Sequence, residues 1–403
     1  MSAYQDATVP AKKHCTDNLD PIFRDFPGNI KKQIALHLHD LCDIYRGPDL
    51  NSLRFFNCNA ADANGGVSFS DAYCCVKPVK KKMFGSVFVT GLSMMSKFLE
   101  EGELPESIPE RFLLSKLLHY LVDEETQAAL LNLEQYDKAD LSIVLANHLI
   151  GKLAPSSRYV IDKHAIGKKM KGRTKCPCSP DCAMSGVFGD TSIGNEEVWH
   201  GQLNIIVNQD IGISSIEDDE ENPEILGGMK LKSSTCSLEN SDQLIAQTVV
   251  FSFLQKQIHP LNEHFLLPCF GVAGTGIVIY FYDSEHDVLL KSSRIPFLKS
   301  TKSDLHMKVN LTAILASWLA VNYKHLSSGL PESLKSEDKK ADFFSQVTEK
   351  IEIYRNKLKL GDVGMSVHPP VPGDMEDSGE ESPDELGDVR CKLYQVVYGG
   401  KKR

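Results

Sequence analysis

The 403-residue chain has no apolar run near the roughly 20 residues that a membrane-spanning helix needs. Residues 1–25 are polar and lack the apolar stretch of a secretory signal peptide. The sequence also lacks Walker and dinucleotide-binding glycine patterns and a Gly-x-Ser-x-Gly motif. These absences argue against a membrane partner, against the common nucleotide-dependent enzymes and against a serine hydrolase.

A regular cysteine framework is also missing. The eleven cysteines are odd in number and scattered along the chain. Secreted disulfide scaffolds instead carry an even number of cysteines at close, regular spacings. We therefore expect a reduced, intracellular protein, in the cytoplasm or the nucleus.

The chain has little excess charge outside one segment. Its net charge is −10, but residues 374–388 alone hold eight carboxylates and no Lys or Arg. The remainder is close to neutral, so the bulk charge neither favours nor excludes a nucleic-acid partner. Hydrophobic content of 42% and charged content of 24% are ordinary for a soluble globular protein with a large core.

Apolar residues at helical spacing dominate the first third of the chain, as in Ile30, Ile34 and Leu38. A basic, cysteine-containing stretch follows, and then runs typical of strands alternate with helices. We predict five segments: a polar leader (1–25), an all-helical region (26–154), a basic crossing segment (155–195), an α/β core with C-terminal helices (196–360) and an acidic, largely disordered tail (361–403).

The predicted core begins with the strand-like run Glu196–Val207. A short second run, Gly227–Lys232, precedes an apolar helix at Ser241–Gln257. Runs rich in β-branched and aromatic residues then predict strands at 266–272, 276–282 and 288–291, followed by a helix at 311–323. This order predicts a mixed sheet with helices packed against it.

Three short motifs in this core occur one after another, on the first strand, the second run and the helix. Asn204 lies in the first strand, Lys230-Leu231-Lys232 forms the second run, and Gln243 or Gln247 lies on the helix. The block resembles the core of the PD-(D/E)XK nuclease-like superfamily, which places an Asp, a Glu-x-Lys and often a Gln at these positions. The resemblance implies a mixed α/β (α+β) fold with a restriction-endonuclease-like core sheet flanked by helices.

The resemblance also implies a damaged metal site. In the superfamily the Asp and Glu hold Mg²⁺, which prefers oxygen ligands, but Asn204 and Lys230 stand in their places. At about 4 Å and an effective dielectric of about 20, repulsion between Lys⁺ and a divalent ion is roughly 8 kcal/mol. We therefore expect a catalytically inactive nuclease-like domain that binds DNA, RNA or a protein. Its expected binding residues are His200, Lys168, Lys169, Lys171 and Arg173.

Two alternatives to this interpretation remain. In one, carboxylates from elsewhere restore a Mg²⁺ or Mn²⁺ site and an active nuclease; the candidates are Asp210, Asp242, Glu239, Glu196 and Glu197. In the other, the chain is a structural or interaction protein whose likeness to nucleases is accidental. Lys230 and Lys232 are then solvated on an edge strand, the two glutamines cap backbone groups, and His200 is structural.

A separate metal site is predicted by Cys176, Cys178 and Cys182, which have the spacing of three zinc ligands with His164 or His200 as the fourth. The basic residues Lys163–Lys175 precede them and suit contact with phosphate groups. The alternative is an exposed loop with three reduced, idle thiols. No other cofactor is expected.

Overall fold

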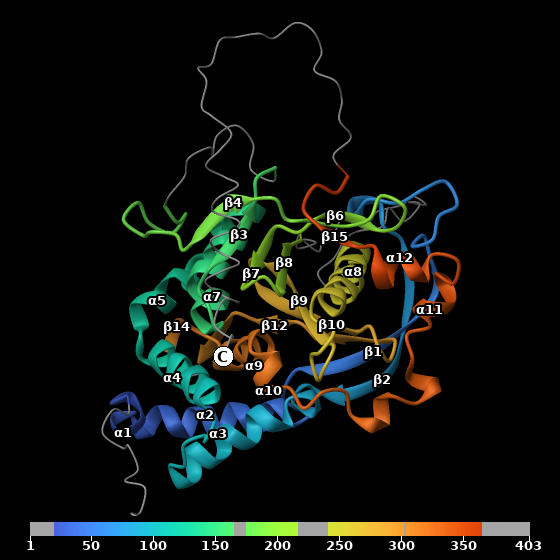
Figure 1. The fold of residues 1–403 in the computed structure, drawn as a ribbon. Coiled ribbons are helices and arrows are strands. Elements are labelled where there is room, and N and C mark those ends of the chain that lie inside the picture. The colour runs from blue at the N-terminus through green and yellow to red at the C-terminus, as the bar shows by residue number, and fades with distance from the viewer. Residues whose placement is uncertain (1–19, 165–174, 217–240, 302–303, 365–403) are drawn as a thin grey trace, which may run out of the picture. The chain divides into compact units, whose positions relative to one another are not determined.

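The largest element of the structure, a computed structural model, is a mixed sheet of ten strands (Figure 1). The structure describes residues 20–164, 175–216, 241–301 and 304–364. The expected run Gly227–Lys232 and the acidic segment 374–388 lie outside the described residues. No described helix combines the length and apolarity needed to cross a bilayer.

The sheet combines strands from distant parts of the chain. Its order is β2 (Cys74–Met83), β1 (Asp49–Cys58), β11 (Val288–Ser292), β10 (Gly276–Asp283), β9 (Leu266–Ala273), β8 (Ile211–Ser215), β7 (Ile205–Val207), β3 (Tyr159–Asp162) and β4 (Gly186–Gly189), with β12 (Ile295–Pro296) paired to β10. The β8–β9 and β3–β4 pairs are parallel, whereas the other neighbouring pairs named here are antiparallel.

Both faces of the sheet are buried. Along β10, Ile277, Ile279 and Phe281 enter one apolar cluster, while Val278, Tyr280 and Tyr282 enter the other. This alternation follows from the two-residue period of a strand, and it explains why the β10 sequence is apolar at nearly every position.

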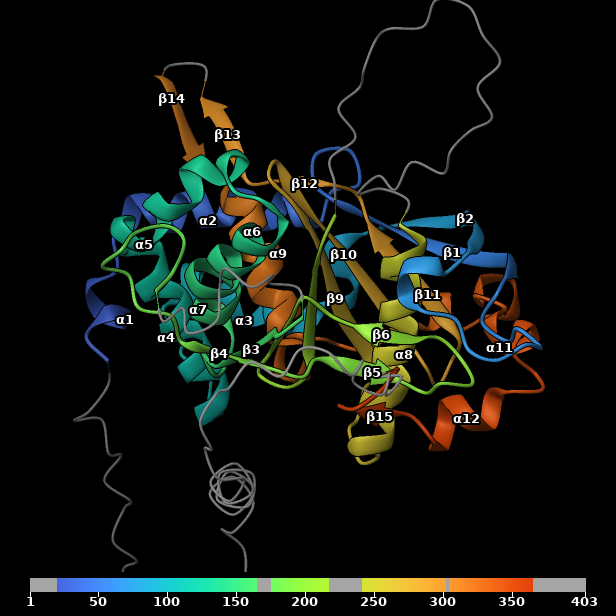
Figure 2. The ribbon, with the colours of Figure 1, turned by 90° about the horizontal axis from the view of Figure 1, so that it is seen from above.

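Helices cover the two faces unequally (Figures 1 and 2). The first face carries α1 (Ile22–Asp25), α2 (Gly28–Leu41), α3 (Val89–Glu101), α4 (Ile108–Val122), α5 (Glu124–Ala128), α6 (Lys138–Leu145), α7 (Gly151–Leu153), α9 (Leu311–Val321) and α10 (Tyr323–Leu326). The second face carries α8 (Asp242–Ile258), α11 (Phe343–Gln346) and α12 (Ile351–Asn356). Two smaller sheets complete the fold: β13 (Leu298–Thr301) with β14 (Asp304–Val309), and β15 (Lys359–Leu360) with β5 (Ser192–Gly194) and β6 (His200–Gln202).

The mixed α/β class is confirmed. The predicted helix, three strands and helix correspond to α8, β9, β10, β11 and α9, but three further strands, β12, β13 and β14, lie between β11 and α9. The run Glu196–Val207, in contrast, is not one strand, because it divides into β6 and β7, which belong to different sheets. Gly201, within β6, has a φ of 142°, a conformation that side chains other than glycine rarely adopt.

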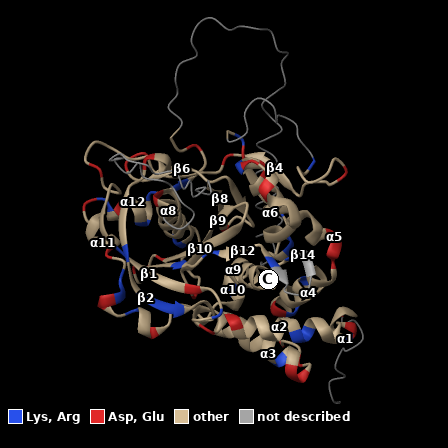
Figure 3. Cartoon of the chain, turned by 180° about the vertical axis from the view of Figure 1, so that it is seen from behind, with Lys and Arg blue, Asp and Glu red and all other residues tan. Residues whose placement is uncertain are grey.

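The prediction that residues 26–154 are all helical is wrong, because β1 and β2 lie within them. Two irregularities of register interrupt their pairing and break the two-residue alternation that would reveal strands in the sequence. In addition, β2 is an edge strand with Pro78 and exposed lysines, features that edge strands tolerate and that discourage pairing with other chains (Figure 3). Residues 49–83 therefore extend the core sheet by two strands, because β1 pairs with β11 and β2 pairs with β1.

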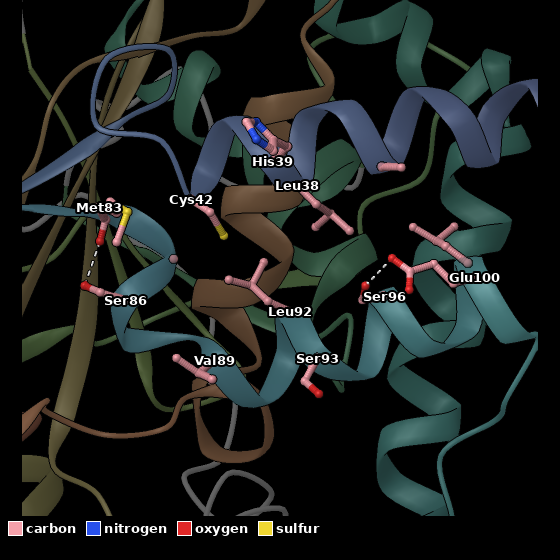
Figure 4. Close-up of a pocket in the computed structure, with 13 residues that line it drawn as sticks. Leu38, His39, Cys42, Met83, Ser86, Val89, Leu92, Ser93, Ser96 and Glu100 are labelled. Atoms are coloured by element: carbon pink, nitrogen blue, oxygen red, sulfur yellow. Dashed lines mark hydrogen bonds between the residues drawn. The ribbon is translucent and has the colours of Figure 1, made fainter.

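A cavity of about 580 Å³ lies between α2 and α3 (Figure 4). Leu38, Leu92 and Leu99 make its wall mostly apolar, and His39 and Glu100 are among its polar residues. No described side chain fills this cavity.

The turn between β10 and β11 holds the segment that precedes α11. Asp287 in this turn accepts hydrogen bonds from the hydroxyl of Tyr282 (2.8 Å) and the backbone N–H of Phe344 (3.3 Å). Its carbonyl accepts another from the N–H of Ala341 (2.6 Å). Burial of the Asp287 carboxyl raises its pKa to about 6, above the ordinary 3.8.

The raised pKa of Asp287 makes stability depend on pH with a definite sign. The folded chain holds this proton more tightly than the unfolded chain, so the stabilisation is complete below pH 3.8 and is lost as pH rises through about 6. The loss amounts to about 3 kcal/mol. Asp287→Asn removes this titration, so the thermal midpoint of the variant should rise relative to wild type between pH 3.8 and about 6. Asp25→Asn, at an exposed position, is the control, and parallel profiles for wild type and Asp287→Asn would contradict the assignment.

Candidate metal centre

Three cysteines and one histidine converge at the edge of the first helical layer. The ligand atoms of His148, Cys176, Cys178 and Cys182 all lie within 4.8 Å of one another. The Nε2 atom of His148 is 3.5 Å from the sulfur of Cys176, 3.0 Å from that of Cys178 and 3.5 Å from that of Cys182. The three predicted thiols are therefore brought together.

The cysteines lie on a short loop that folds back on itself. The N–H of Cys176 donates to the carbonyl of Cys182 (2.8 Å), and the N–H of Cys182 donates to the carbonyl of Ser179 (3.1 Å). Just outside the loop, Lys175 and Ala183 form an isolated antiparallel bridge. This closure places the three sulfurs on one side of the loop, facing the helices.

The histidine comes from an unusual piece of helix. Residues Ala146–Ile150 continue α6 as a single π-helical turn before α7 begins at Gly151. Such turns are rare and occur frequently at functional sites. Within this turn Asn147 and His148 are both buried, and both side chains contact the cysteine loop.

Asn147 fixes the loop against the helix. Its amide nitrogen donates to the carbonyl of Ala183 (3.3 Å) and lies 3.5 Å from the sulfur of Cys182. Its amide oxygen accepts from the hydroxyl of Tyr159 (3.1 Å) and the N–H of Ser185 (3.2 Å). One side chain thus joins the π-helical turn, the cysteine loop and β3.

The spacing of the four donors is close to what a tetrahedral metal ion needs, since two of the three sulfur–nitrogen distances are 3.5 Å and the third, to Cys178, is shorter at 3.0 Å. With a Zn–S distance of about 2.3 Å and a Zn–N distance of about 2.1 Å, a tetrahedral ion separates sulfur from nitrogen by about 3.6 Å. Burial lowers the pKa of His148, so its imidazole is neutral and able to ligate. Burial also raises the pKa of the Cys176 and Cys178 thiols, whereas a bound cation would favour their thiolates.

One feature of a typical metal-bound histidine is missing from the described residues. The other ring nitrogen of a metal ligand usually donates to a carboxylate, a carbonyl or water. The Nδ1 atom of His148 is buried and has no hydrogen-bond partner among the described protein groups. The ring is instead held by its neighbour Asn147 and by the cysteine loop.

The prediction that His164 or His200 is the fourth ligand is wrong, because His148 is the histidine next to the three cysteines. His164 is exposed and is not part of the group, and His200 lies in β6, where its Nδ1 contacts the carbonyl of Val198 (2.9 Å). His148 was missed because it is far from the cysteines in sequence and lies on an apolar helix. The adjacent polar pair Asn147-His148 within that helix was the available signal.

The described residues of the predicted nuclease site make structural contacts. The side-chain oxygen of Asn204 accepts from the N–H of Ser215 in β8 (2.9 Å), and its carbonyl accepts from the N–H of Asp162 in β3 (2.9 Å). Gln247 donates to the carbonyl of Gln202 (3.0 Å). Gln243 is half-buried one turn earlier on α8.

The other residues named for that site are either outside the described residues or not grouped with one another. The predicted residues Lys230, Lys232, Lys168, Lys169, Lys171, Arg173 and Glu239 lie outside the described residues. Asp210 is buried and forms an ion pair with Lys324 (2.8 Å). Glu196 and Glu197 are exposed, and within the described ranges no carboxylates join a potential metal-ligand group.

Comparison of the chain with models of protein families, with curated proteins and with solved structures gave no match. The candidate site is therefore interpreted from its own geometry.

Tight packing behind Asn147 gives a test of this arrangement. A Cβ atom at Gly186 in β4 would overlap the ring of Tyr159. Gly186→Ala should therefore displace Tyr159, weaken its hydrogen bond to Asn147 and cost about 1–3 kcal/mol of stability. Gly28→Ala is the matched control, because no atom lies within 4 Å of the added Cβ. Equal thermal midpoints for the two variants would show that Tyr159 does not support the cysteine loop.

Proposed function

We propose that the chain is a non-catalytic, zinc-stabilised module that binds nucleic acid. The observation that carries this proposal is the group of four protein ligands, His148, Cys176, Cys178 and Cys182. Thiolate and imidazole donors suit Zn²⁺, and four protein ligands leave no open position for water or substrate. Catalytic zinc sites keep such a position open, so this donor set favours a structural role.

A run of basic residues directly before the cysteine loop supports nucleic acid as the partner. Residues 163–175 carry six Lys or Arg side chains and no carboxylate. The described residues at the two ends of this run are fixed, since the N–H of Lys163 donates to the carbonyl of Gly189 in β4 (3.0 Å) and Lys175 pairs with Ala183 beside the cysteine loop. A zinc ion would therefore anchor a basic segment, and basic segments bind phosphate backbones through counterion release.

The contacts of Asn204 and Gln247 support the absence of catalysis. The side-chain oxygen of Asn204 and the side-chain nitrogen of Gln247 are used in hydrogen bonds to the backbone, and Asp210, one of the carboxylates named as substitute metal ligands, is paired with Lys324. The nuclease-like ancestry stays part of the proposal, resting on the motif order in the sequence.

Metal analysis tests the zinc site. The protein purified under reducing conditions should hold about one zinc ion per chain, because the described residues contain one group of four suitable donors. Cys178→Ser should lower the zinc content and the thermal midpoint together, since metal binding is coupled to folding. The control is Cys42→Ser, which changes an exposed thiol of α2's C-cap. Equal zinc contents in Cys178→Ser and Cys42→Ser would overturn the site.

Salt-dependent binding tests the partner. Affinity for single-stranded RNA or duplex DNA should fall as salt rises, and the triple variant Lys168→Glu, Lys169→Glu, Lys171→Glu should bind more weakly and with a shallower salt slope. For duplex DNA each lost phosphate contact reduces the slope by about 0.9.

A charge-matched control distinguishes this segment from the other lysine-rich element. The triple variant Lys77→Glu, Lys80→Glu, Lys82→Glu changes three lysines of β2, at the far edge of the sheet (Figure 3). It should keep the wild-type salt slope. Equal losses in both variants would mean non-specific attraction, and no binding at low salt would leave a protein partner as the better hypothesis.

A further inference from the structure

Two cysteines face each other across the ladder of β1 and β2. Cys58, at the end of β1, is the register partner of Cys74, the first residue of β2, and both are free thiols. The N–H of Asn59 donates to the carbonyl of Tyr73 (3.2 Å), so the next pair along is hydrogen-bonded. Because the two kinds of pair alternate along an antiparallel ladder, Cys58 and Cys74 form a non-hydrogen-bonded pair, in which opposite side chains lie closest.

The spacing of such a pair is close to that of a disulfide. In a non-hydrogen-bonded pair the Cα atoms are about 4.5 Å apart and the Cβ atoms about 4.5–5.5 Å apart. A disulfide joins Cα atoms about 4.4–6.8 Å apart and Cβ atoms about 3.5–4.5 Å apart. The sulfurs of Cys58 and Cys74 can therefore bond after a small approach of the two Cβ atoms.

The position of the pair in the sheet makes this approach easier. Within the described ranges, β2 is the end of the large sheet and has no strand on its outer side. The register of the two strands is also irregular between Phe55 and Asn57, directly before Cys58. An edge strand beside such an irregularity can shift more readily than the central strands. A disulfide formed under this constraint is easier to reduce than an unstrained one, so its formation is reversible.

Both thiols face the apolar cluster on the second face of the sheet. Cys74 belongs to this cluster, and Cys58 packs against its border. Burial raises the pKa of the Cys58 thiol to about 11. Burial also raises the pKa of Cys74 well above its usual value, and the neighbouring Asp242 and Cys58 reinforce that shift. Both sulfurs are therefore thiols at neutral pH, in contact with the same part of the core.

Cys75 provides an internal comparison. It follows Cys74 in the sequence, but successive side chains of a strand point to opposite faces. Its register partner is Asn57, which is exposed. In the folded chain Cys75 therefore faces away from Cys58, whereas in an unfolded chain Cys74 and Cys75 would be nearly equivalent partners.

We propose that Cys58 and Cys74 are a modification site, a thiol pair that a small-molecule disulfide oxidises reversibly to an intramolecular disulfide. Cys58 is the more accessible of the two, so its thiolate attacks one sulfur of the oxidant and releases the other as a thiolate. The sulfur of Cys74 then attacks the mixed disulfide at Cys58 and releases the second small thiolate. Each protein thiol gives its proton to one released thiolate, so two protein thiols and one small disulfide become one protein disulfide and two small thiols.

The disulfide would close the base of segment 59–73, which contacts other parts of the fold. Nε1 of Trp199 donates to the side-chain oxygen of Asn59 (2.9 Å), and the N–H of His200 in β6 donates to the carbonyl of Val67 (3.1 Å). Oxidation thus restricts the segment through which the edge of the large sheet contacts β6. The pair shares no residue with the metal centre or with the basic segment.

The test is equilibration of the full chain, without denaturant and at mildly alkaline pH, with mixtures of oxidised and reduced glutathione. Free thiols are then trapped with N-ethylmaleimide, and tryptic peptides are analysed by mass spectrometry. Trypsin releases the three cysteines of this region together in residues 55–80, because Lys77 precedes a proline. Disulfide formation should lower the mass of this peptide by two hydrogen atoms and leave one trapped thiol, and dithiothreitol should reverse the change.

Two matched variants locate the bond. In the folded state Cys75→Ala should form the internal disulfide as wild type does. Cys74→Ala should form at least about tenfold less of it, because Cys75 is not aligned with Cys58. In concentrated urea the two variants should oxidise alike, since strand register no longer distinguishes the neighbouring cysteines. Circular dichroism checks that each variant is folded before oxidation.

Two results would overturn the proposal. One is the absence of the internal disulfide from folded wild type at every glutathione ratio, including ratios at which the exposed Cys42 carries glutathione. The other is a folded Cys75→Ala variant that forms no more internal disulfide than folded Cys74→Ala does. Failure of zinc binding or of nucleic-acid binding would change neither measurement, so the two proposals can be judged separately.

Discussion

Burial of the central strands on both faces is the constraint on which the structure depends. A strand such as β10, apolar at nearly every position, is stable only if helices cover both sides of it. The chain meets this requirement with a thick helical layer on one face and with α8, α11 and α12 on the other. The candidate metal centre lies where this covering ends, at the border between the helical layer and the edge of the sheet.

The metal centre is one such border. The parallel pair β3–β4 ends the sheet, and Val187 in β4 is 64% exposed, so packing on its outer side contributes little. The contacts of His148 with the three cysteines, together with the hydrogen bonds of Asn147, join the loop before β4 to the helical layer. A metal ion bound by these four residues would supply at this edge the stability that apolar burial supplies at the centre of the sheet.

The parts of the fold that were predictable from sequence have a regular period. The helix at α8 and the strands β9, β10 and β11 follow from apolar runs of the right length and spacing. The strands β1 and β2 were not predictable, because irregular register, Pro78 and a lysine run hide their alternation. The grouping of Cys176, Cys178 and Cys182 was predictable because the three cysteines are close together in the sequence. The participation of His148 was not, because only tertiary contacts bring it to the cysteines.

The π-helical turn at Ala146–Ile150 has a consequence for how this chain tolerates change in length. A π turn holds one residue more than an α turn, so it is equivalent to a single inserted amino acid absorbed within a continuous helix. Removing one residue there would restore ordinary helical winding and rotate the side chains that precede it relative to those that follow. Asn147 and His148 would then no longer face the cysteine loop together. A one-residue deletion could in this way separate the imidazole from the thiols while leaving the helix itself intact.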